Sequence, residues 1–245
     1  NVARALARNG IAATVANSRG PASLAALVAE LGPSITAGTV AEAASADIVF
    51  VALRWTDTET VLSRLPAWNN RIVVDGTNPV EFLDPNSPAA NDPANPLAAY
   101  GIKAVDLGGR ASSSLIRALV PGARVVKAFN HLDVNALPQP QLSGGQRVLF
   151  YSGDDAAAKA EIRALIEAMR FFPVDLGALL RLELGEQPTA HLAEPPDGQG
   201  QRVGQTGTHP PLGGLLELSL ERDRQVLELV GGVDHLPGPL RRAPD

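Results

Sequence analysis

The sequence predicts a doubly wound α/β fold with a mostly parallel sheet over residues 1–182, followed by an irregular C-terminal segment, 183–245. Short runs rich in β-branched residues alternate with helical stretches rich in Ala and Leu up to about residue 177, which is the pattern of parallel strands joined by crossover helices. Several strand runs are apolar at consecutive positions, as strands covered on both faces are. Because such crossovers are right-handed, we expect helices on both faces of an open sheet.

The predicted elements follow in order. The chain opens with the helical run "NVARALARNG", then a strand at 12–18, then a helix at 20–32 with Pro21 near its start and Gly32 at its end. The remaining predicted elements are a helix at 39–46, a strand at 47–53, a helix at 56–65 capped by Thr56 or Asp57, a strand at 71–79, a long Pro-rich loop at 81–100, a helix at 112–122, strands at 123–130 and 146–155, a helix at 156–170 and a strand at 171–177. We expect about six strands and helical connections throughout.

The C-terminal segment has a different texture. Residues 185–211 are rich in Gly, Pro and Gln, which is typical of a linker or of disorder. Residues 212–232 fit an amphipathic helix or, by the alternation of Leu216, Leu218 and Leu220, a strand.

Composition limits the classes of function. The chain has 245 residues, 45% of them hydrophobic and 19% charged, which is typical of a globular protein. It has no Cys, which excludes disulfides and thiolate chemistry, and no apolar run long enough to span a membrane. A net charge of −5 with scattered basic residues argues against nucleic acid, and the four His residues share no metal-ligand spacing. We therefore expect a cytoplasmic protein with a small-molecule partner, no metal, no membrane and no nucleic acid.

In an open parallel sheet a ligand lies at the carboxyl ends of the strands, so the loops there are informative. The first is "ANSRGP", in which Ser18 and Arg19 follow the early strand. In a dinucleotide-binding unit an acidic residue at this position binds the ribose 2′-hydroxyl, whereas Arg accommodates a 2′-phosphate. The turn carries no acidic residue, so it favours NADP. The alternative is an ordinary polar turn before a helix that begins with proline.

The next two loops follow buried strands. After the strand at 47–53, Ala52 and Leu53 would let the backbone approach a cofactor ribose while Arg54 and Trp55 cover it, although Trp55 could equally pack on the core. In "DGTNP", exposed Thr77 and Asn78 side chains and free backbone amides would suit a carboxamide or a substrate carbonyl. An Asn-Pro turn without a binding role is the alternative.

The fourth loop is "KAFNHL". It brings together a candidate donor, Lys127, an aromatic ring, Phe129, and the imidazole of His131 at the end of a buried strand. Such a histidine beside a redox cofactor can bond to a carbonyl or move a proton. Capping of a helix by a surface histidine is the alternative.

Two other polar clusters have structural explanations. The serines at 112–114 lie at the start of a helix, and Asp154 and Asp155 immediately precede one; capping explains both clusters. No Gly-x-Ser-x-Gly elbow is present, which argues against acyl transfer.

Over residues 1 to about 180 the chain resembles the deazaflavin-dependent NADP oxidoreductase family, the NADPH:coenzyme F-420 oxidoreductases. The resemblance is carried by five stretches, "NVARALARNG", "ANSRGP", "RIVVDGTNP", "GARVVKAFN" and "VLFYSGDDAAAKAEIRALIE…FFPVDLG". The resemblance implies a Rossmann-like NAD(P)-binding domain and direct hydride transfer between NADP and a deazaflavin or a small organic acceptor, with no catalytic side chain. The cofactor-binding positions that follow are Asn1, Val2, Ala3, Ser18, Arg19, Ala52, Leu53, Thr77, Asn78, Ala128, Asn130 and His131. Asn130 stands where some relatives carry His.

The sequence departs from the family at both ends. Family members begin with an apolar strand and Gly-x-Gly, so that Ala3 would be the last small residue of the phosphate-binding turn. Here the first strand and both glycines are missing, so the chain is either a fragment or a remnant that binds dinucleotide poorly. A missing central strand would expose two strand edges, an aggregation liability for a functional protein, and we therefore expect a fragment. The family's C-terminal segment completes the deazaflavin site and often a homodimer, and "GEQPTAHLAEPPDGQGQ" does not match it. Two functions therefore remain: an NADP-dependent oxidoreductase, or a non-catalytic dinucleotide-binding or sensing module, including an inactive fragment of such an enzyme.

Overall fold

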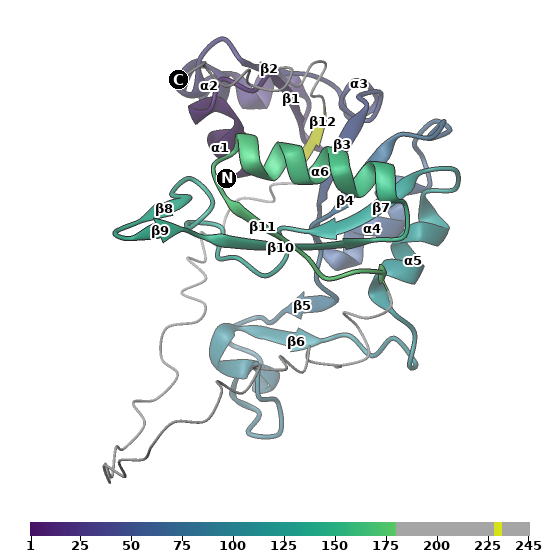
Figure 1. Ribbon diagram of the computed structural model, residues 1–245. Coiled ribbons are helices and arrows are strands. Elements are labelled where there is room, and N and C mark those ends of the chain that lie inside the picture. Colours follow the sequence, from purple (N-terminus) through teal and green to yellow (C-terminus); the bar gives the residue numbers. More distant parts are fainter. Residues whose placement is uncertain (180–227, 232–245) are drawn as a thin grey trace, which may run out of the picture.

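The computed structural model describes residues 1–179 and 228–231. Its centre is an eight-stranded sheet with the strand order β11-β10-β7-β4-β3-β12-β1-β2 (Figure 1). In chain order the strands of this sheet are β1 (Ala13–Ala16), β2 (Ile35–Ala37), β3 (Ile48–Ala52), β4 (Ile72–Asp75), β7 (Arg124–Ala128), β10 (Val148–Gly153), β11 (Phe172–Asp175) and β12 (Glu228–Gly231).

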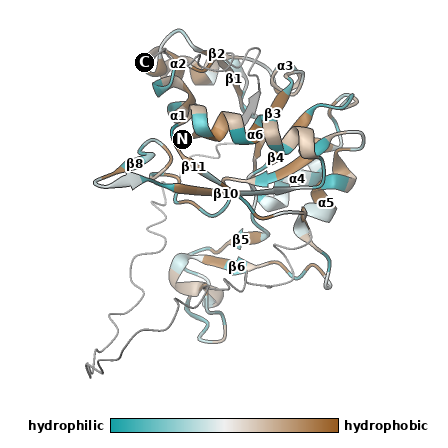
Figure 2. Ribbon diagram, viewed as in Figure 1, coloured by the Kyte–Doolittle hydropathy of each residue, from teal (hydrophilic) through white to brown (hydrophobic). Residues whose placement is uncertain are grey.

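Helices cover both faces of the sheet, as predicted. One core lies between the sheet and α1, α2 and α6, and a second lies between the opposite face and α3, α4 and α5. The helices are α1 (Val2–Arg8), α2 (Ala25–Leu31), α3 (Val40–Ala43), α4 (Trp55–Leu62), α5 (Ser112–Leu119) and α6 (Ala156–Ala168). Hydrophilic and hydrophobic segments alternate along α6 in Figure 2, because one side of this helix packs on the sheet while the other meets solvent. The doubly wound α/β prediction is confirmed.

The strand directions explain where the loops gather. Four pairs of neighbouring strands are parallel: β1 with β2, β3 with β4, β4 with β7, and β10 with β11. β10 runs antiparallel to β7, so the expectation that every connection is helical is wrong at this point. The connection at 129–147 holds no helix but a small hairpin, β8 (Gln141–Leu142) and β9 (Gly145–Gln146). Without a crossover, the chain returns along the neighbouring position in the opposite direction.

The position between β1 and β3 is occupied by β12, which pairs antiparallel with both. The two reversals of direction leave β1 and β3 pointing the same way. The expected pair of exposed strand edges is therefore wrong for the residues that the structure describes. Of the segment 212–232, for which helix and strand were both open, 228–231 is a strand; the rest of 183–245 lies outside the described residues.

Several predicted element boundaries are confirmed. A 3₁₀ turn at Pro21–Leu24 leads into α2, with proline at its first position, and Gly32 follows α2 with φ of 85°, a conformation that favours glycine. Asp155 caps α6, because its Oδ1 accepts a hydrogen bond of 2.7 Å from the amide of Ala158.

Two predicted caps are wrong. The residue before α4 is Arg54, so the helix begins earlier than a cap at Thr56 or Asp57 would allow. The residue before α5 is Ala111, so the serines at 112–114 lie within the first turn of the helix instead of capping it. In both cases the chain enters the helix directly from an extended residue with ψ near 140°.

The Pro-rich segment between β4 and α5 lies beyond the carboxyl end of β4 (Figure 1). It is framed by a two-stranded hairpin, β5 (Val80–Phe82) and β6 (Ile102–Ala104). Two 3₁₀ turns, Pro88–Asn91 and Ala98–Tyr100, lie between these strands. The expected long loop at 81–100 is thus confirmed as largely irregular, although its first residues continue β5.

Candidate functional site

Four parallel strands, β1, β3, β4 and β7, end at the same edge of the sheet. Their following loops, at 17–20, 53–54, 76–79 and 129–131, contain most of the residues that the sequence singles out. In an open α/β sheet this carboxyl edge is where ligands bind. We therefore take these four loops together as the candidate site.

The turn after β1 is held from beneath by a buried asparagine. Asn17 is 2% exposed, and its Oδ1 accepts from the amide of Arg19 at 2.9 Å and from the hydroxyl of Ser23 at 3.1 Å. Ser18 and Arg19 themselves are exposed. Within the described part of the chain, neither the Ser18 hydroxyl nor the Arg19 guanidinium has a hydrogen-bond partner among the side chains. The turn is thus fixed in its backbone while both predicted phosphate ligands face solvent.

The end of β3 lies against the β5–β6 hairpin. Ala52 is half-buried, and Leu53 is buried, so Leu53 can offer a ligand little more than its backbone. The guanidinium of Arg54 lies over the ring of Phe82, 5.2 Å from its centre, a cation–π contact that joins this loop to the hairpin. Trp55 is half-buried against the core, which supports the packing interpretation for this residue.

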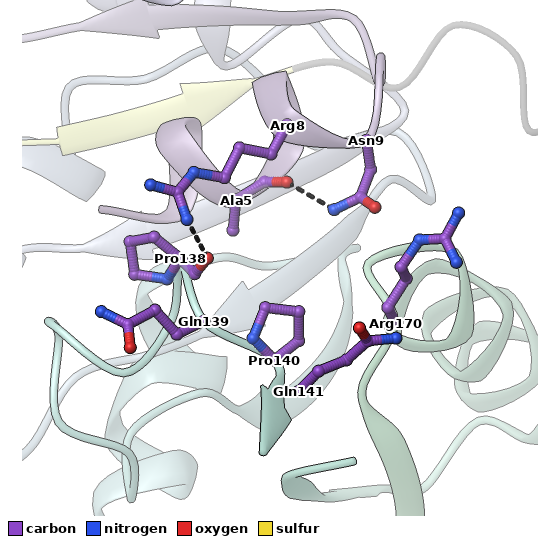
Figure 3. Close-up of a pocket in the computed structure, with 8 residues that line it drawn as sticks. All are labelled: Ala5, Arg8, Asn9, Pro138, Gln139, Pro140, Gln141 and Arg170. Atoms are coloured by element: carbon purple, nitrogen blue, oxygen red, sulfur yellow. Dashed lines mark hydrogen bonds between the residues drawn. The ribbon is translucent and has the colours of Figure 1, made fainter. Parts of the chain in front are cut away.

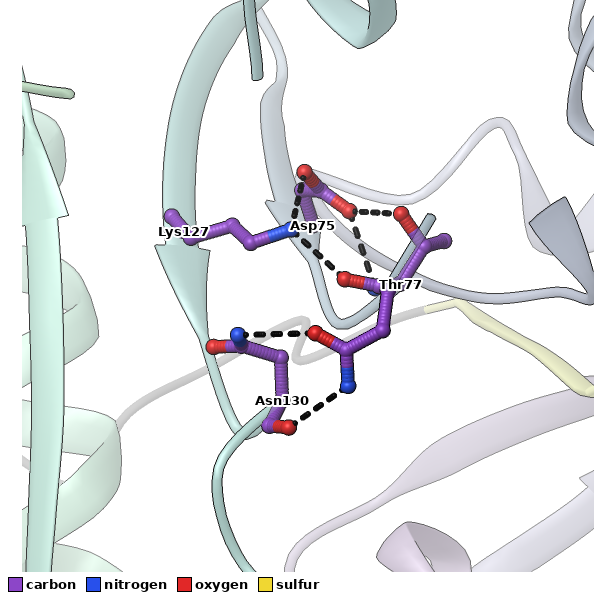
Figure 4. A network of polar contacts seen from close by, with 5 residues as sticks. Asp75, Thr77, Lys127 and Asn130 are labelled. Carbon is purple, nitrogen blue, oxygen red and sulfur yellow. Dashed lines mark hydrogen bonds and ion pairs between the residues drawn. The ribbon is translucent and has the colours of Figure 1, made fainter. Parts of the chain in front are cut away.

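A buried polar network joins the ends of β4 and β7 (Figure 4). Lys127 Nζ donates to Asp75 Oδ2 at 2.9 Å and to the carbonyl of Thr77 at 2.6 Å. Asp75 Oδ1 accepts from the amide of Thr77 at 2.9 Å and from its hydroxyl at 2.7 Å. The expectation that Thr77 is exposed with a free amide is therefore wrong, because Thr77 is 2% exposed and all of its polar groups are hydrogen-bonded. Lys127 is likewise not an open donor.

Above this network, two asparagine side chains pair across the loops. Asn78 Nδ2 donates to the carbonyl of Asn130 at 2.8 Å, and Asn130 Nδ2 donates to Asn78 Oδ1 at 3.2 Å. Asn78 is exposed and Asn130 is half-buried. Phe129, between the strand and Asn130, is buried with φ of 68° and meets the ring of Phe50 edge-on at 5.1 Å. Ala128 is fully buried, so only its backbone could face a ligand.

His131 contacts the sheet. Its Nε2 accepts a hydrogen bond of 3.3 Å from the amide of Phe150 on β10, and its ring lies 5.1 Å from that of Phe150. Desolvation lowers the pKa of His131, and a bond to the backbone of Val148 opposes this in part. An accepting Nε2 requires the neutral ring. The imidazole thus bonds to the backbone of β10 beyond the point where β7 ends. It does not cap a helix, which was the alternative considered for this residue.

The first residues of the chain enter the core. Val2 and Ala3 are buried, and the carbonyl of Asn1 accepts from the amide of Ala5 at 3.1 Å, so Asn1 precedes the first turn of α1. The helical start of the chain is confirmed, and the role of these three residues at a phosphate stays a prediction.

A separate hollow of about 370 Å³ lies at the other end of α1 (Figure 3). Its walls include Arg8, whose guanidinium donates to the carbonyl of Pro138, and Arg170. None of the residues predicted for the cofactor lines it. The candidate site at the carboxyl edge is therefore distinct from this hollow.

Within the described ranges no helix has the length and apolar character that crossing a membrane requires. The same residues contain no cluster of three or more His, Asp or Glu side chains that could hold a metal ion.

Comparison with known proteins is consistent with this geometry. A family model described as "NADP oxidoreductase coenzyme F420-dependent" matches residues 1–79, the part of the chain that includes the first three loops of the site. A solved hypothetical protein from Sinorhizobium meliloti is 37% identical, with a TM-score of 0.64, over 74% of this chain and 81% of that one. The chain belongs to this family of NADP oxidoreductases.

Two further relatives are more distant. A putative F420-dependent NADP-reductase from Arthrobacter sp. FB24 is 24% identical over 74% of this chain and 80% of its own, with a TM-score of 0.57, a likeness of fold. Metalloreductase STEAP3 of Rattus norvegicus is 28% identical over 167 residues, which are 67% of this chain and 29% of that protein. The chain thus spans less than a third of this curated relative.

Three features of the site were not predicted from the sequence: the buried Asn17 support, the Asp75–Lys127 pair and the contact between Arg54 and Phe82. A signal for the pair was present, because each charge directly follows an apolar run, in "RIVVDG" and "ARVVKAF". Two opposite charges in two buried strands must find each other or solvent.

Proposed function

We propose that the protein is an NADP(H)-dependent oxidoreductase that transfers a hydride between the nicotinamide ring and a deazaflavin or a small organic acceptor. The observation that carries the proposal is the turn after β1, where Ser18 and Arg19 are exposed on a backbone fixed by Asn17. The family of the chain and the name of its Arthrobacter relative support the choice of NADP.

The chemistry of the turn suits a 2′-phosphate. A guanidinium can form two parallel charge-assisted hydrogen bonds with phosphate oxygens, and a serine hydroxyl adds a third donor. An acidic side chain, which would bind the 2′-hydroxyl of NAD and repel a phosphate, is absent from residues 16–20. The residues present at this position therefore fit NADP better than NAD.

The other end of the cofactor would lie over the loops after β3, β4 and β7. Ala52 is small and half-buried, so a ribose could approach its backbone, and Asn78 and Asn130 present amide groups at the surface. Amides both donate and accept, which matches the nicotinamide carboxamide. NADPH supplies the hydride when bound; the chain's part is to hold donor and acceptor about 3–3.5 Å apart and to exclude water. Arg54 and Phe82 form the wall on which we place the acceptor.

The 2′-phosphate assignment is tested by the double variant Ser18→Ala/Arg19→Ala. Loss of even one charge-assisted hydrogen bond costs about 1.5–3 kcal/mol, so NADPH affinity should fall at least about 10-fold. NADH affinity should change less than threefold, and the matched control Arg64→Ala, an exposed arginine after α4, should leave both unchanged. Dissociation constants from titration of nicotinamide fluorescence measure this, and an equal loss for both cofactors would reject the assignment.

A turnover assay distinguishes an oxidoreductase from a protein that only binds the dinucleotide. We expect NADPH oxidation with a deazaflavin acceptor, followed by absorbance, and slower oxidation with small carbonyl or imine acceptors. Tight NADPH binding without any turnover would instead favour the dinucleotide-binding or sensing module.

A further inference from the structure

The Asp75–Lys127 ion pair is almost completely removed from water. The side chains are 0% and 7% exposed, and the two residues are direct neighbours in the parallel register of β4 and β7. A buried ion pair is seldom more stabilising than two apolar side chains of similar size, because both charges must be desolvated. Stability alone therefore does not account for charges at this position.

The pair fixes the residue that leads into the exposed amides. The carboxylate of Asp75 accepts from the amide and the hydroxyl of Thr77, while Lys127 Nζ donates to its carbonyl. All three polar groups of Thr77 are thus bonded to the pair (Figure 4). Thr77 directly precedes Asn78, so the loop after β4 is held to β4 and to β7 at once.

The contacts close a ring. From Lys127 they pass through Asp75 and Thr77 to Asn78, whose amide bonds to Asn130, three residues beyond Lys127 on the same chain segment. The charged members of the ring are buried, and the amides lie at the surface.

We propose that Asp75 and Lys127 are positioning residues that set the orientation of the Asn78–Asn130 amide pair, so that this pair reads the carboxamide of the nicotinamide ring. The inference rests on the proposed function. Each amide nitrogen carries two hydrogens and uses one within the pair. One hydrogen on each therefore remains, together with acceptor capacity, for a planar group that both donates and accepts.

The test compares NADPH with its 3-acetylpyridine analogue, in which a methyl group replaces the carboxamide nitrogen, so that the ring substituent accepts but cannot donate. One lost hydrogen bond corresponds to about tenfold in affinity. We expect the full chain to bind NADPH about tenfold more tightly than the analogue, and Asn78→Ala to reduce this ratio to about one or two. Both dissociation constants can be measured without turnover.

The ratio should also fall, to threefold or less, in Asp75→Asn/Lys127→Met, which removes both buried charges and touches neither amide. Thr77→Val keeps both charges and removes only the hydroxyl bond to Asp75, so a partial fall is expected there whether or not the charge variant folds. The matched control is Ser152→Ala: Ser152 is the buried cross-strand neighbour of Lys127, its hydroxyl has no partner in the described structure, and the ratio should stay at its original value.

The outcomes separate the two proposals. If the unmodified chain fails to bind NADPH, the proposed function is wrong. If it binds NADPH and prefers it to the analogue, but every folded variant of the pair and of Thr77 keeps the original ratio, the positioning role alone is overturned. A fall in the ratio with unchanged binding of 2′-phospho-ADP-ribose, which lacks the nicotinamide, supports it.

Discussion

Removing one member of the buried ion pair should destabilise the protein far more than removing both. In Lys127→Met the carboxylate of Asp75 keeps its two bonds from Thr77 but loses the cation 2.9 Å away, in a place that is 0% exposed. Breaking such a pair costs about 3–5 kcal/mol, a large part of the roughly 5–15 kcal/mol that stabilises a typical domain. In Asp75→Asn/Lys127→Met the asparagine oxygen still accepts from Thr77 and no charge is buried, so we expect a loss of about 1 kcal/mol.

Urea unfolding followed by circular dichroism measures both values. With a slope of about 2–3 kcal/mol per molar urea, the midpoint of Lys127→Met should fall by about 1–2 M and that of the double variant by less than about 0.5 M. The matched control is Arg163→Met, which breaks the 3.0 Å pair with Glu167 where both side chains are more than half exposed and where the midpoint should hardly move. A double variant as unstable as Lys127→Met would refute the reasoning.

Three further predictions concern single residues. Desolvation lowers the pKa of His131 in the folded chain, so the unfolded chain binds a proton more readily. The free energy of unfolding should therefore fall as the pH drops below about 6.5. The variant His131→Gln can still accept a hydrogen bond from the amide of Phe150, and it should flatten this dependence in unfolding experiments at several pH values. Phe82→Ala should raise the KM for the acceptor about 3- to 10-fold in steady-state assays. It should leave the NADPH dissociation constant unchanged in binding assays, because Phe82 contacts Arg54 away from the turn after β1. Asp155→Ala should lower the free energy of unfolding by about 1 kcal/mol, measured in urea, through loss of the α6 cap.

Each of these has an outcome that contradicts it. A His131→Gln protein with the same pH profile as the original would assign the acid sensitivity to other groups. A rise in the NADPH dissociation constant in Phe82→Ala equal to the rise in acceptor KM would place this ring against the cofactor. For Asp155→Ala, Asp154→Ala provides a comparison, since Asp154 instead bonds to Arg117 and to the amide of Leu179.

The sequence predicted the order of helices and strands well because apolar periodicity and turn residues are local signals. It failed where pairing between distant segments decides. The direction of β10 depends on what lies between 129 and 147, and the absence of a helical pattern there was a usable sign that no crossover is made. The occupation of the gap between β1 and β3 by residues 228–231 could not be inferred, since a short run such as "ELVG" fits helix or strand equally.

For the site, the residue types were informative and their environments were not. Ser18 and Arg19 were expected to hold a 2′-phosphate; both are exposed, and their role at a phosphate stays a prediction. Thr77 was expected to be exposed, but the charges two residues before it and on the neighbouring strand draw its polar groups inward. Contacts of this kind depend on the register of two strands, which the sequence of one chain does not specify.

Phe129 limits how the loop after β7 can change. A left-handed φ of 68° costs a non-glycine residue about 1–2 kcal/mol, so glycine would relieve strain at this position. Glycine would also remove a buried ring and its edge-on contact with Phe50, which contribute roughly 2–4 kcal/mol. The aromatic residue is thus kept against its own backbone preference. Laboratory evolution toward new acceptors should therefore find its accepted substitutions at His131, while position 129 stays aromatic.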